Sequence, residues 1–204
     1  ANFPFCTIEP NVGSVSVPDQ RLNLLGELSK SKQIIPTRIE FVDIAGLVKG
    51  ASKGEGLGNK FLANIREVDA IVHVIRCFSD DDVIHVSGSV DPKRDIEIIN
   101  LELALSDLNQ IEKRRTRLKK QLSTNKEAKL EDETLEKLSL ALENENAVRS
   151  VLLTEEEEKL IKPLGLLTQK PIIYATNLGE DELSKGNNFS EEVNNHAKEE
   201  GSEC

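Results

Sequence analysis

The chain has 204 residues, an apolar content of 38% and a formal net charge of −10, which together indicate one sizeable globular domain, with or without an insert. Its apolar runs are only a few residues long, so we expect no membrane-spanning helix and no membrane partner. The negative charge argues against DNA and against general polyanion binding, whereas a local basic patch stays compatible with RNA.

The three cysteines, Cys6, Cys77 and Cys204, are widely scattered, and their spacing matches no metal site. Such a set favours a reducing environment, so we expect a cytoplasmic protein, with an organelle left open. The first residue is Ala1 rather than Met, and the sequence stops at Cys204 in mid-pattern. We therefore expect the sequence to be part of a longer protein.

The predicted strands and helices alternate along the chain, which indicates an α/β fold with a doubly wound, mostly parallel sheet. Asp19 is the expected cap of the first helix. The two longest apolar runs are typical of parallel strands that are covered on both faces. In chain order the predicted elements are a strand at 12–17, a helix at 20–29, a strand at 37–42, a helix at 59–68, and strands at 70–75 and 171–176.

A helical segment separates the two apolar strands. Apolar residues recur there with the 3-4 spacing of a coiled coil, and Arg115 is the polar exception. After the polar stretch 123–132, three leucines continue the pattern, which predicts an α-helical coiled-coil hairpin inserted into the α/β domain. Thr154 and Glu157 form a capping-box pattern for a further short helix. The apolar positions are 101, 104, 108, 111, 118 and 122 in the first helix and 135, 138 and 142 in the second.

Asp43 and Gly46 give the most informative pattern of the chain. The strand at 37–42 delivers Asp43 to a sheet edge, and a loop with further glycines follows Gly46. In P-loop nucleotide hydrolases an acidic residue at this point holds Mg²⁺, and the glycine offers its backbone N–H to the γ-phosphate. We predict that Asp43, Ile44, Ala45, Gly46 and Leu47 contact the nucleotide, with Gly46 in the catalytic machinery. The alternative is a strand followed by a flexible surface loop.

Three further residues bear on metal binding and hydrolysis. Thr7 precedes the Asp43 strand in a loop, where its hydroxyl would be a second ligand of Mg²⁺; taken alone it is an ordinary loop threonine. His85 follows the 70–75 strand at the same edge and is a candidate catalytic residue, with a capping or structural role as the alternative. Leu47 stands where many GTPases carry a glutamine that orients water, so hydrolysis must be slow or use another group.

The segment Asn177-Leu178-Gly179-Glu180 follows the last predicted strand, where α/β proteins bind ligands. Guanine-specific relatives read N-K-x-D there, and the Asp accepts hydrogen bonds from guanine N1–H and the 2-amino group. Leu178 and Glu180 replace the Lys and the Asp. We therefore predict that Asn177 and Leu178 hold adenine, that Glu180 belongs to the same nucleotide-binding loop, and that GTP is disfavoured. The alternative is a turn that merely ends a strand.

A basic run extends from Lys113 to Lys120 on the predicted hairpin. A solvated coiled-coil face is the default interpretation of such a run. The more specific alternative is that this run contacts ribosomal or other RNA.

With these residues in hand, the chain resembles the Obg-like ATPase (YchF) family of P-loop proteins. The resemblance implies a G domain at 1–95 and 163–204, interrupted by a coiled-coil insert at 96–162. It also implies Mg²⁺, ATP in preference to GTP, and association with the ribosome, on the large subunit or its RNA. The matching segments are NFPFCTIEPN (2–11), FVDIAGLVKGASKGEGLGNKFLANIRE (41–67), HVIRCF (73–78), DDDVIHVSG (80–88) and DIEIINLELALSDL (95–108).

The resemblance further implies a P-loop, G-x-x-N-x-G-K-S-T, ahead of Ala1 and a TGS domain after Cys204. A P-loop supplies several charge-assisted hydrogen bonds of about 1.5–3 kcal/mol each. We therefore expect residues 1–204 alone to bind nucleotide weakly and not to turn it over. The alternative function is a non-catalytic module in which the hairpin binds the ribosome or a protein.

Overall fold

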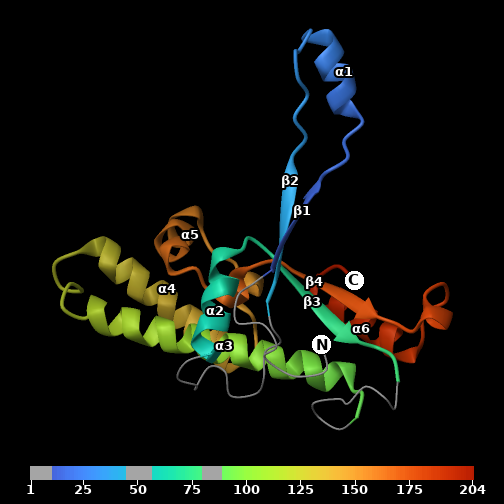
Figure 1. Ribbon diagram of the computed structural model, residues 1–204. Helices are drawn as coiled ribbons and strands as arrows, with labels where there is room; N and C mark the ends of the chain where they lie inside the picture. The colour runs from blue at the N-terminus through green and yellow to red at the C-terminus, as the bar shows by residue number, and fades with distance from the viewer. Residues whose placement is uncertain (1–10, 45–56, 80–88) are drawn as a thin grey trace. The chain divides into compact units, whose positions relative to one another are not determined.

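The computed structural model describes residues 11–44, 57–79 and 89–204 (Figure 1). Its contacts divide the described residues into two compact units, residues 11–44 and residues 57–79 with 89–204. This division follows contact density and does not test the domain boundaries expected from the sequence, which stay a prediction.

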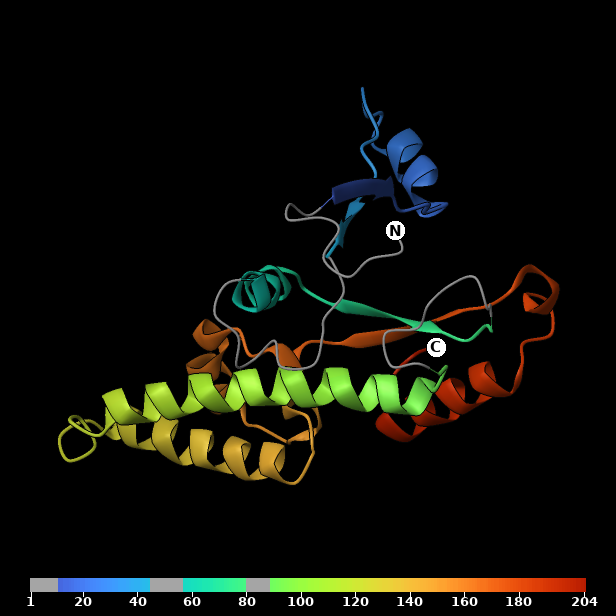
Figure 2. The same cartoon turned by 60° about the horizontal axis from the view of Figure 1, so that its bottom comes forward.

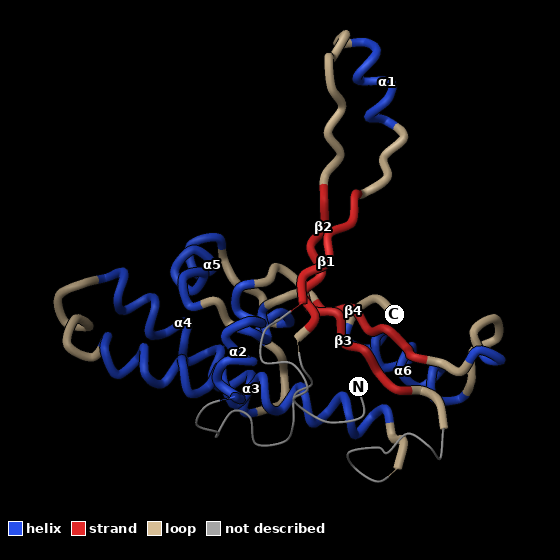
Figure 3. Tube along the Cα trace, viewed as in Figure 1, coloured by secondary structure: helices blue, strands red, loops and turns tan. Residues whose placement is uncertain are grey.

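The first unit is a strand pair with a short helix between its strands (Figure 3). Strand β1 (Asn11–Ser16) pairs antiparallel with β2 (Arg38–Asp43), so that Asn11 lies opposite Asp43. Helix α1 (Arg21–Leu28) connects them. These elements confirm the predicted ones, except that Gln20 rather than Asp19 occupies the N-cap position of α1. The Asp19 carboxylate still accepts the backbone N–H of the first helical residue at 2.9 Å.

The second unit contains a parallel strand pair, β3 (Ile71–Arg76) and β4 (Ile172–Asn177). Helices α3 (Pro92–Leu118) and α6 (Asn188–Glu200) pack on the same face of this pair (Figure 2). The prediction that β3 is covered on both faces is wrong for the described residues. Val72 and Val74 are 45% and 64% exposed, because α3 and α6 cover only the face with the alternate side chains.

The helical insert is confirmed as an antiparallel hairpin of α3 and α4 (Lys126–Glu143). Its core includes Ile111 and Leu135, both fully buried. The predicted seam is wrong at Leu101, which is 51% exposed. That half of α3 packs on β3 and α6 instead of α4, so different positions face inward there. Helix α4 begins inside the stretch expected to be a break, capped by the side chain of Asn125.

Two shorter helices complete the described second unit. Helix α2 (Leu57–Glu67) lies ahead of β3, and α5 (Glu155–Ile161) begins with the predicted capping box. In that box the backbone N–H of Thr154 donates to Glu157 at 2.7 Å, and the backbone N–H of Glu157 donates to the Thr154 hydroxyl at 3.3 Å. In the part of the chain that the structure describes, no helix is long and apolar enough to span a bilayer.

Helix α6, in the acidic C-terminal region, is partly buried. Helix α6 buries Val193 and Ala197 completely against the strand pair. After Gly201, which adopts a left-handed backbone, the chain returns along β4. There the backbone N–H of Tyr174 donates to the carbonyl of Glu203 at 2.9 Å, which adds a short third segment to the edge of β4.

Candidate functional site

Asp43 is the last residue of β2 and its side chain is exposed. Ile44 follows it and is partly buried. Strand pairing explains the position, because the register with Asn11 ends here and leaves the carboxylate at the tip of the strand. A single exposed carboxylate suits Mg²⁺, which keeps several waters and takes only one or two protein carboxylates. The other predicted residues of this region, Thr7, Ala45, Gly46, Leu47 and His85, lie outside the described residues.

Asn177 ends β4 at the carboxyl edge of the parallel pair. It lies in register with Arg76 of β3, and its carbonyl accepts the backbone N–H of Cys77 at 2.8 Å, which extends the pairing by one step. Its side chain is exposed, and within residues 11–44, 57–79 and 89–204 its amide has no hydrogen-bond partner. The amide is therefore available to a ligand at the edge where α/β proteins bind them.

The two other predicted base contacts have different surroundings. Leu178 is half-buried and packs against the core formed by β3, β4 and α6, so part of its side chain is already occupied by the protein. Glu180 begins the short 3₁₀ turn η4 (Glu180–Glu182) and is exposed. The structure thus brings Asn177, Leu178 and Glu180 together on one edge, with a fixed leucine between two solvent-facing polar residues.

Asn187 fixes this loop, and sequence reasoning missed it. Its side-chain amide donates to the carbonyl of Cys77 at 2.7 Å and to the carboxylate of Glu182 at 2.8 Å. Its side-chain oxygen accepts the backbone N–H of Ser190 at 3.0 Å and so caps α6. One side chain therefore ties the end of β3, the loop after β4 and the start of α6. An asparagine just ahead of a helical segment was the available signal.

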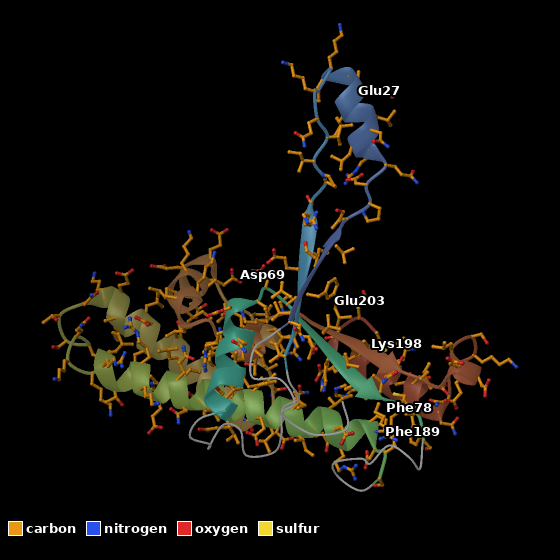
Figure 4. All side chains as sticks on the ribbon, in the orientation of Figure 1. Glu27, Asp69, Phe78, Phe189, Lys198 and Glu203 are labelled. Atoms are coloured by element: carbon orange, nitrogen blue, oxygen red, sulfur yellow. The ribbon has the colours of Figure 1, made fainter. Side chains whose placement is uncertain are left out.

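The end of β3 carries a second fixed contact. The guanidinium of Arg76 lies over the ring of Phe78, 4.5 Å from its centroid, and donates to the Phe78 carbonyl at 3.1 Å. Figure 4 labels Phe78 just past β3 and Phe189 near the start of α6. The cation–π contact and the hydrogen bond restrict Arg76 next to the exposed Asn177.

His73 lies in β3 and is partly buried. Its ring lies 5.8 Å from that of Tyr174. Burial lowers the pKa of His73 to about 4, the charge of His196 lowers it further, and Glu200 opposes the shift. The imidazole is therefore neutral at neutral pH. The Tyr174 hydroxyl donates to Glu200 at 2.9 Å, which closes a buried polar cluster beneath α6.

The basic run on α3 divides into two groups. Arg114 makes a bidentate ion pair with the carboxylate of Glu131, with N–O distances of 2.6 and 2.7 Å, and Arg115 pairs with Asp132 at 2.9 Å. These two arginines join α3 to α4. The remaining cations are exposed, and among the described residues they have no ion-pair partner; they are Lys113, Arg117, Lys119 and Lys120.

No cluster of three or more metal-ligating side chains occurs among the described residues. Asp43 is the described member of the predicted metal pair, since Thr7 is outside the described part of the chain. The described donor set therefore fits a cation that is held largely by water and phosphate, rather than a closed structural metal site.

A family model described as "50S ribosome-binding GTPase" matches residues 1–126. The "Ribosome-binding ATPase YchF" of Bacillus subtilis (strain 168) is 56% identical over 206 residues, which cover 100% of this chain and 56% of that protein. The protein of the same name from Escherichia coli O157:H7 is 53% identical, covering 99% of this chain and 56% of its own length. The chain thus spans about half the length of the curated relatives it matches.

Among solved structures, the YchF GTPase of Schizosaccharomyces pombe is similar over 100% of this chain and 57% of its own chain. The TM-score is 0.78 and the sequence identity is 39%. At this identity and coverage the likeness shows a shared fold.

Proposed function

This chain belongs to the family of 50S ribosome-binding GTPases, with the Obg-like ATPases (YchF) as its relatives, and we propose that it forms part of a Mg²⁺-dependent nucleoside triphosphatase that prefers ATP to GTP. The fold is that of a P-loop G domain with a helical insert. The strongest support for the base preference is the edge formed by Asn177, Leu178 and Glu180.

Leu178 and Glu180 support adenine over guanine. A lysine at 178 could lie along the base, whereas Leu178 is fixed against the core and presents only an apolar edge. Glu180 is one methylene longer than the usual Asp and starts a 3₁₀ turn, so we expect its carboxylate to be displaced from the place where an Asp would accept guanine N1–H. The exposed Asn177 amide can pair with the adenine 6-amino group and N7.

The metal and phosphate contacts are carried over to Thr7, Asp43 and Gly46. Mg²⁺, when bound, neutralises charge on the phosphate oxygens. Asp43 would hold its water shell from the tip of β2. With Leu47 in place of a water-orienting glutamine, hydrolysis is expected to be slow. The scattered cysteines and the ribosomal family support a cytoplasmic location.

The ribosome contact is proposed to use the four exposed cations Lys113, Arg117, Lys119 and Lys120. Arg114 and Arg115 are excluded from this role because Glu131 and Asp132 already neutralise them. Removing the four cations should weaken binding to large ribosomal subunits and lower its salt dependence, as loss of phosphate contacts requires. Unchanged ribosome binding would assign the hairpin another partner.

The base preference is tested with the protein as its gene encodes it, by measuring affinity for MgATP and MgGTP. The double change Leu178→Lys with Glu180→Asp should raise GTP affinity relative to ATP by about tenfold or more, because each restored hydrogen bond to a charged group contributes about 1.5–3 kcal/mol. The matched control is Glu182→Asp, an acid in the same turn whose carboxylate already binds Asn187. Equal affinity for both nucleotides before and after the change would contradict the assignment.

Hydrolysis is tested by phosphate release with and without EDTA. Asp43→Asn should abolish the Mg²⁺-dependent rate, whereas Glu40→Gln, an exposed acid on the same strand, should leave it unchanged. A rate that survives the loss of the Asp43 carboxylate would overturn its role.

A further inference from the structure

The side-chain amide of Asn187 makes two hydrogen bonds that lead to different parts of the candidate site. It donates to the carbonyl of Cys77 at 2.7 Å and to the carboxylate of Glu182 at 2.8 Å. Both donors of the amide are thereby used. Cys77 lies just past β3 and is fully buried, whereas Glu182 ends the turn η4. Asn187 therefore joins the core to the turn that begins with Glu180.

The bond to Cys77 connects Asn187 to the strand end that carries Asn177. The backbone N–H of Cys77 donates to the carbonyl of Asn177 at 2.8 Å, and the carbonyl of Cys77 accepts the Asn187 amide. Asn177 itself is held by strand pairing, since it lies in register with Arg76. Loss of the Asn187 amide would therefore leave Asn177 in place.

The turn after Asn177 is held internally by bonds between backbone groups. The N–H of Glu182 donates to the carbonyl of Gly179 at 3.0 Å. The N–H groups of Lys185 and Gly186 donate to the carbonyl of Glu182 at 3.2 and 2.7 Å. These bonds fold the turn on itself but do not fix its place relative to the strands. The bond from Asn187 to Glu182 attaches the turn to the start of α6.

The oxygen of the same side chain begins helix α6. It accepts the backbone N–H of Ser190 at 3.0 Å, and the Ser190 hydroxyl accepts the backbone N–H of Asn187 at 2.9 Å. This is a capping box. Gly186, one residue earlier, has a φ of +69°, and a Cβ there would lie 2.8 Å from the Ser190 hydroxyl. The chain thus turns tightly into the cap, and three hydrogen bonds then hold the Asn187 side chain in one orientation.

We propose that Asn187 is a positioning residue for base specificity, which holds η4 in the arrangement that disfavours guanine. The inference deepens the proposed function and rests on the proposed binding of adenine at Asn177 and Leu178. Rejection of guanine depends on where the Glu180 carboxylate stands, and Glu180 is two residues from Glu182, which Asn187 holds. Without the two donors the turn can shift, so that the Glu180 carboxylate reaches guanine N1–H in part of the population.

The test is the ratio of the dissociation constants for MgGTP and MgATP, measured by calorimetry on the protein as its gene encodes it. Asn187→Asp keeps an oxygen that caps α6, but it removes both donors and places a second carboxylate against Glu182. Asn187→Ser keeps a capping oxygen without the added charge. In both variants the ratio should fall by about fivefold or more, while the affinity for MgATP changes by less than about twofold. A role in folding alone would weaken the binding of both nucleotides equally.

The partner of Asn187 in the turn gives a second route to the same effect. Glu182→Ala removes one of the two acceptors and should lower the ratio by about twofold, which is less than the Asn187 changes because the bond to Cys77 remains. Glu182→Asp, in contrast, keeps a carboxylate that accepts the amide and should retain the ratio.

Two other asparagines separate positioning from loss of structure. Asn125 caps α4 with its side chain, as Asn187 caps α6, but it lies in the helical insert. Asn125→Ala should lower the denaturant midpoint and leave the nucleotide ratio unchanged. Asn188 is the neighbour of Asn187 and is exposed, so Asn188→Ala should leave both unchanged.

The outcomes are distinct. If the unaltered protein does not prefer ATP, the proposed base preference fails and this inference fails with it. If it prefers ATP and the full ratio persists in Asn187→Asp and Asn187→Ser, the inference alone is overturned and Asn187 is only a helix cap. A ratio that falls equally in Asn125→Ala would also overturn the inference, because the effect would then follow general stability.

Discussion

The strand pair β1–β2 and the helical hairpin α3–α4 are both simple two-element units, yet their cores could hardly differ more. None of the described residues of the strand-pair unit is buried, and Val15 and Phe41 are 56% and 52% exposed. In the hairpin, Ile111, Leu135 and Leu138 are fully buried. A two-stranded hairpin is marginal in water, whereas two long helices can bury a continuous seam between them. We therefore expect the hairpin to contribute more to stability than the unit of β1, α1 and β2.

Leu135→Ala is expected to have the largest effect on stability. Truncating a fully buried leucine should lower the free energy of unfolding by about 2–5 kcal/mol, because contacts are lost and a cavity is left. The matched change Val15→Ala in β1 should cost less than about 1 kcal/mol, since the side chain is mostly in solvent. Urea unfolding followed by circular dichroism measures both. Comparable losses at the two positions would contradict the contrast.

Acidification is expected to have the next largest effect, because His73 of β3 is partly buried. Its pKa is lowered to about 4, so the unfolded chain takes up a proton near pH 6.5 that the native state takes up only near pH 4. Stability should therefore fall as the pH drops through this window, by up to about 3 kcal/mol.

His73→Phe should flatten this pH dependence while keeping the ring contact with Tyr174. The charged neighbours that face the imidazole, His196 and Glu200, remain in the variant. Unfolding free energies measured from pH 7 to pH 4 decide the point: parallel curves for the two proteins would remove His73 as the cause.

A smaller effect is expected from the ion pairs that join the two helices of the hairpin. Arg114→Ala leaves Glu131, which is 5% exposed, without its partner and should cost about 1–3 kcal/mol. Lys113→Ala, one residue earlier and exposed, should change stability by no more than about 0.5 kcal/mol. Thermal unfolding of the two variants side by side measures the difference. Equal melting temperatures would show that the Arg114–Glu131 ion pair contributes no more to stability than an exposed contact.

The smallest effect concerns helix caps. Thr154→Ala removes the capping box of α5 and should cost about 1 kcal/mol. Gln20→Ala, at the N-cap of α1, should have almost no effect because its side chain makes no capping hydrogen bond. Denaturant midpoints measured on the two variants test this. Equal shifts for Gln20→Ala and Thr154→Ala would contradict the expectation that the cap of α1 contributes less to stability than the cap of α5.

Local patterns predicted the elements well. The strands at 12–17 and 37–42 were predicted close to β1 and β2, the 3-4 spacing predicted the hairpin, and Thr154 with Glu157 predicted a cap that the structure confirms. Each of these signals lies within a few residues of the feature it predicts. They succeed because spacing on a strand or helix determines which side chains share a face.

Long-range features could not be predicted in this way. Leu101 continues the heptad pattern but is exposed, because α3 leaves α4 and packs on a different partner there. Arg66 and Asp107 each bind residues tens of positions away, and nothing near them in the sequence marks those partners. At the candidate site, the position of Asn177 at the end of a strand was predicted. The contacts of Asn187 were not, because they join residues from the end of β3, the loop after β4 and the start of α6.

Tyr174 gives the molecule a built-in optical probe. The chain has one tyrosine and no tryptophan, so its intrinsic emission comes from a single ring beneath α6. Its hydroxyl donates a hydrogen bond to a carboxylate, and two imidazoles, those of His73 and His196, lie near the ring; such contacts quench phenol fluorescence. Brightening of the signal would thus report release of α6 from the sheet, without any label and independently of the strand-pair unit.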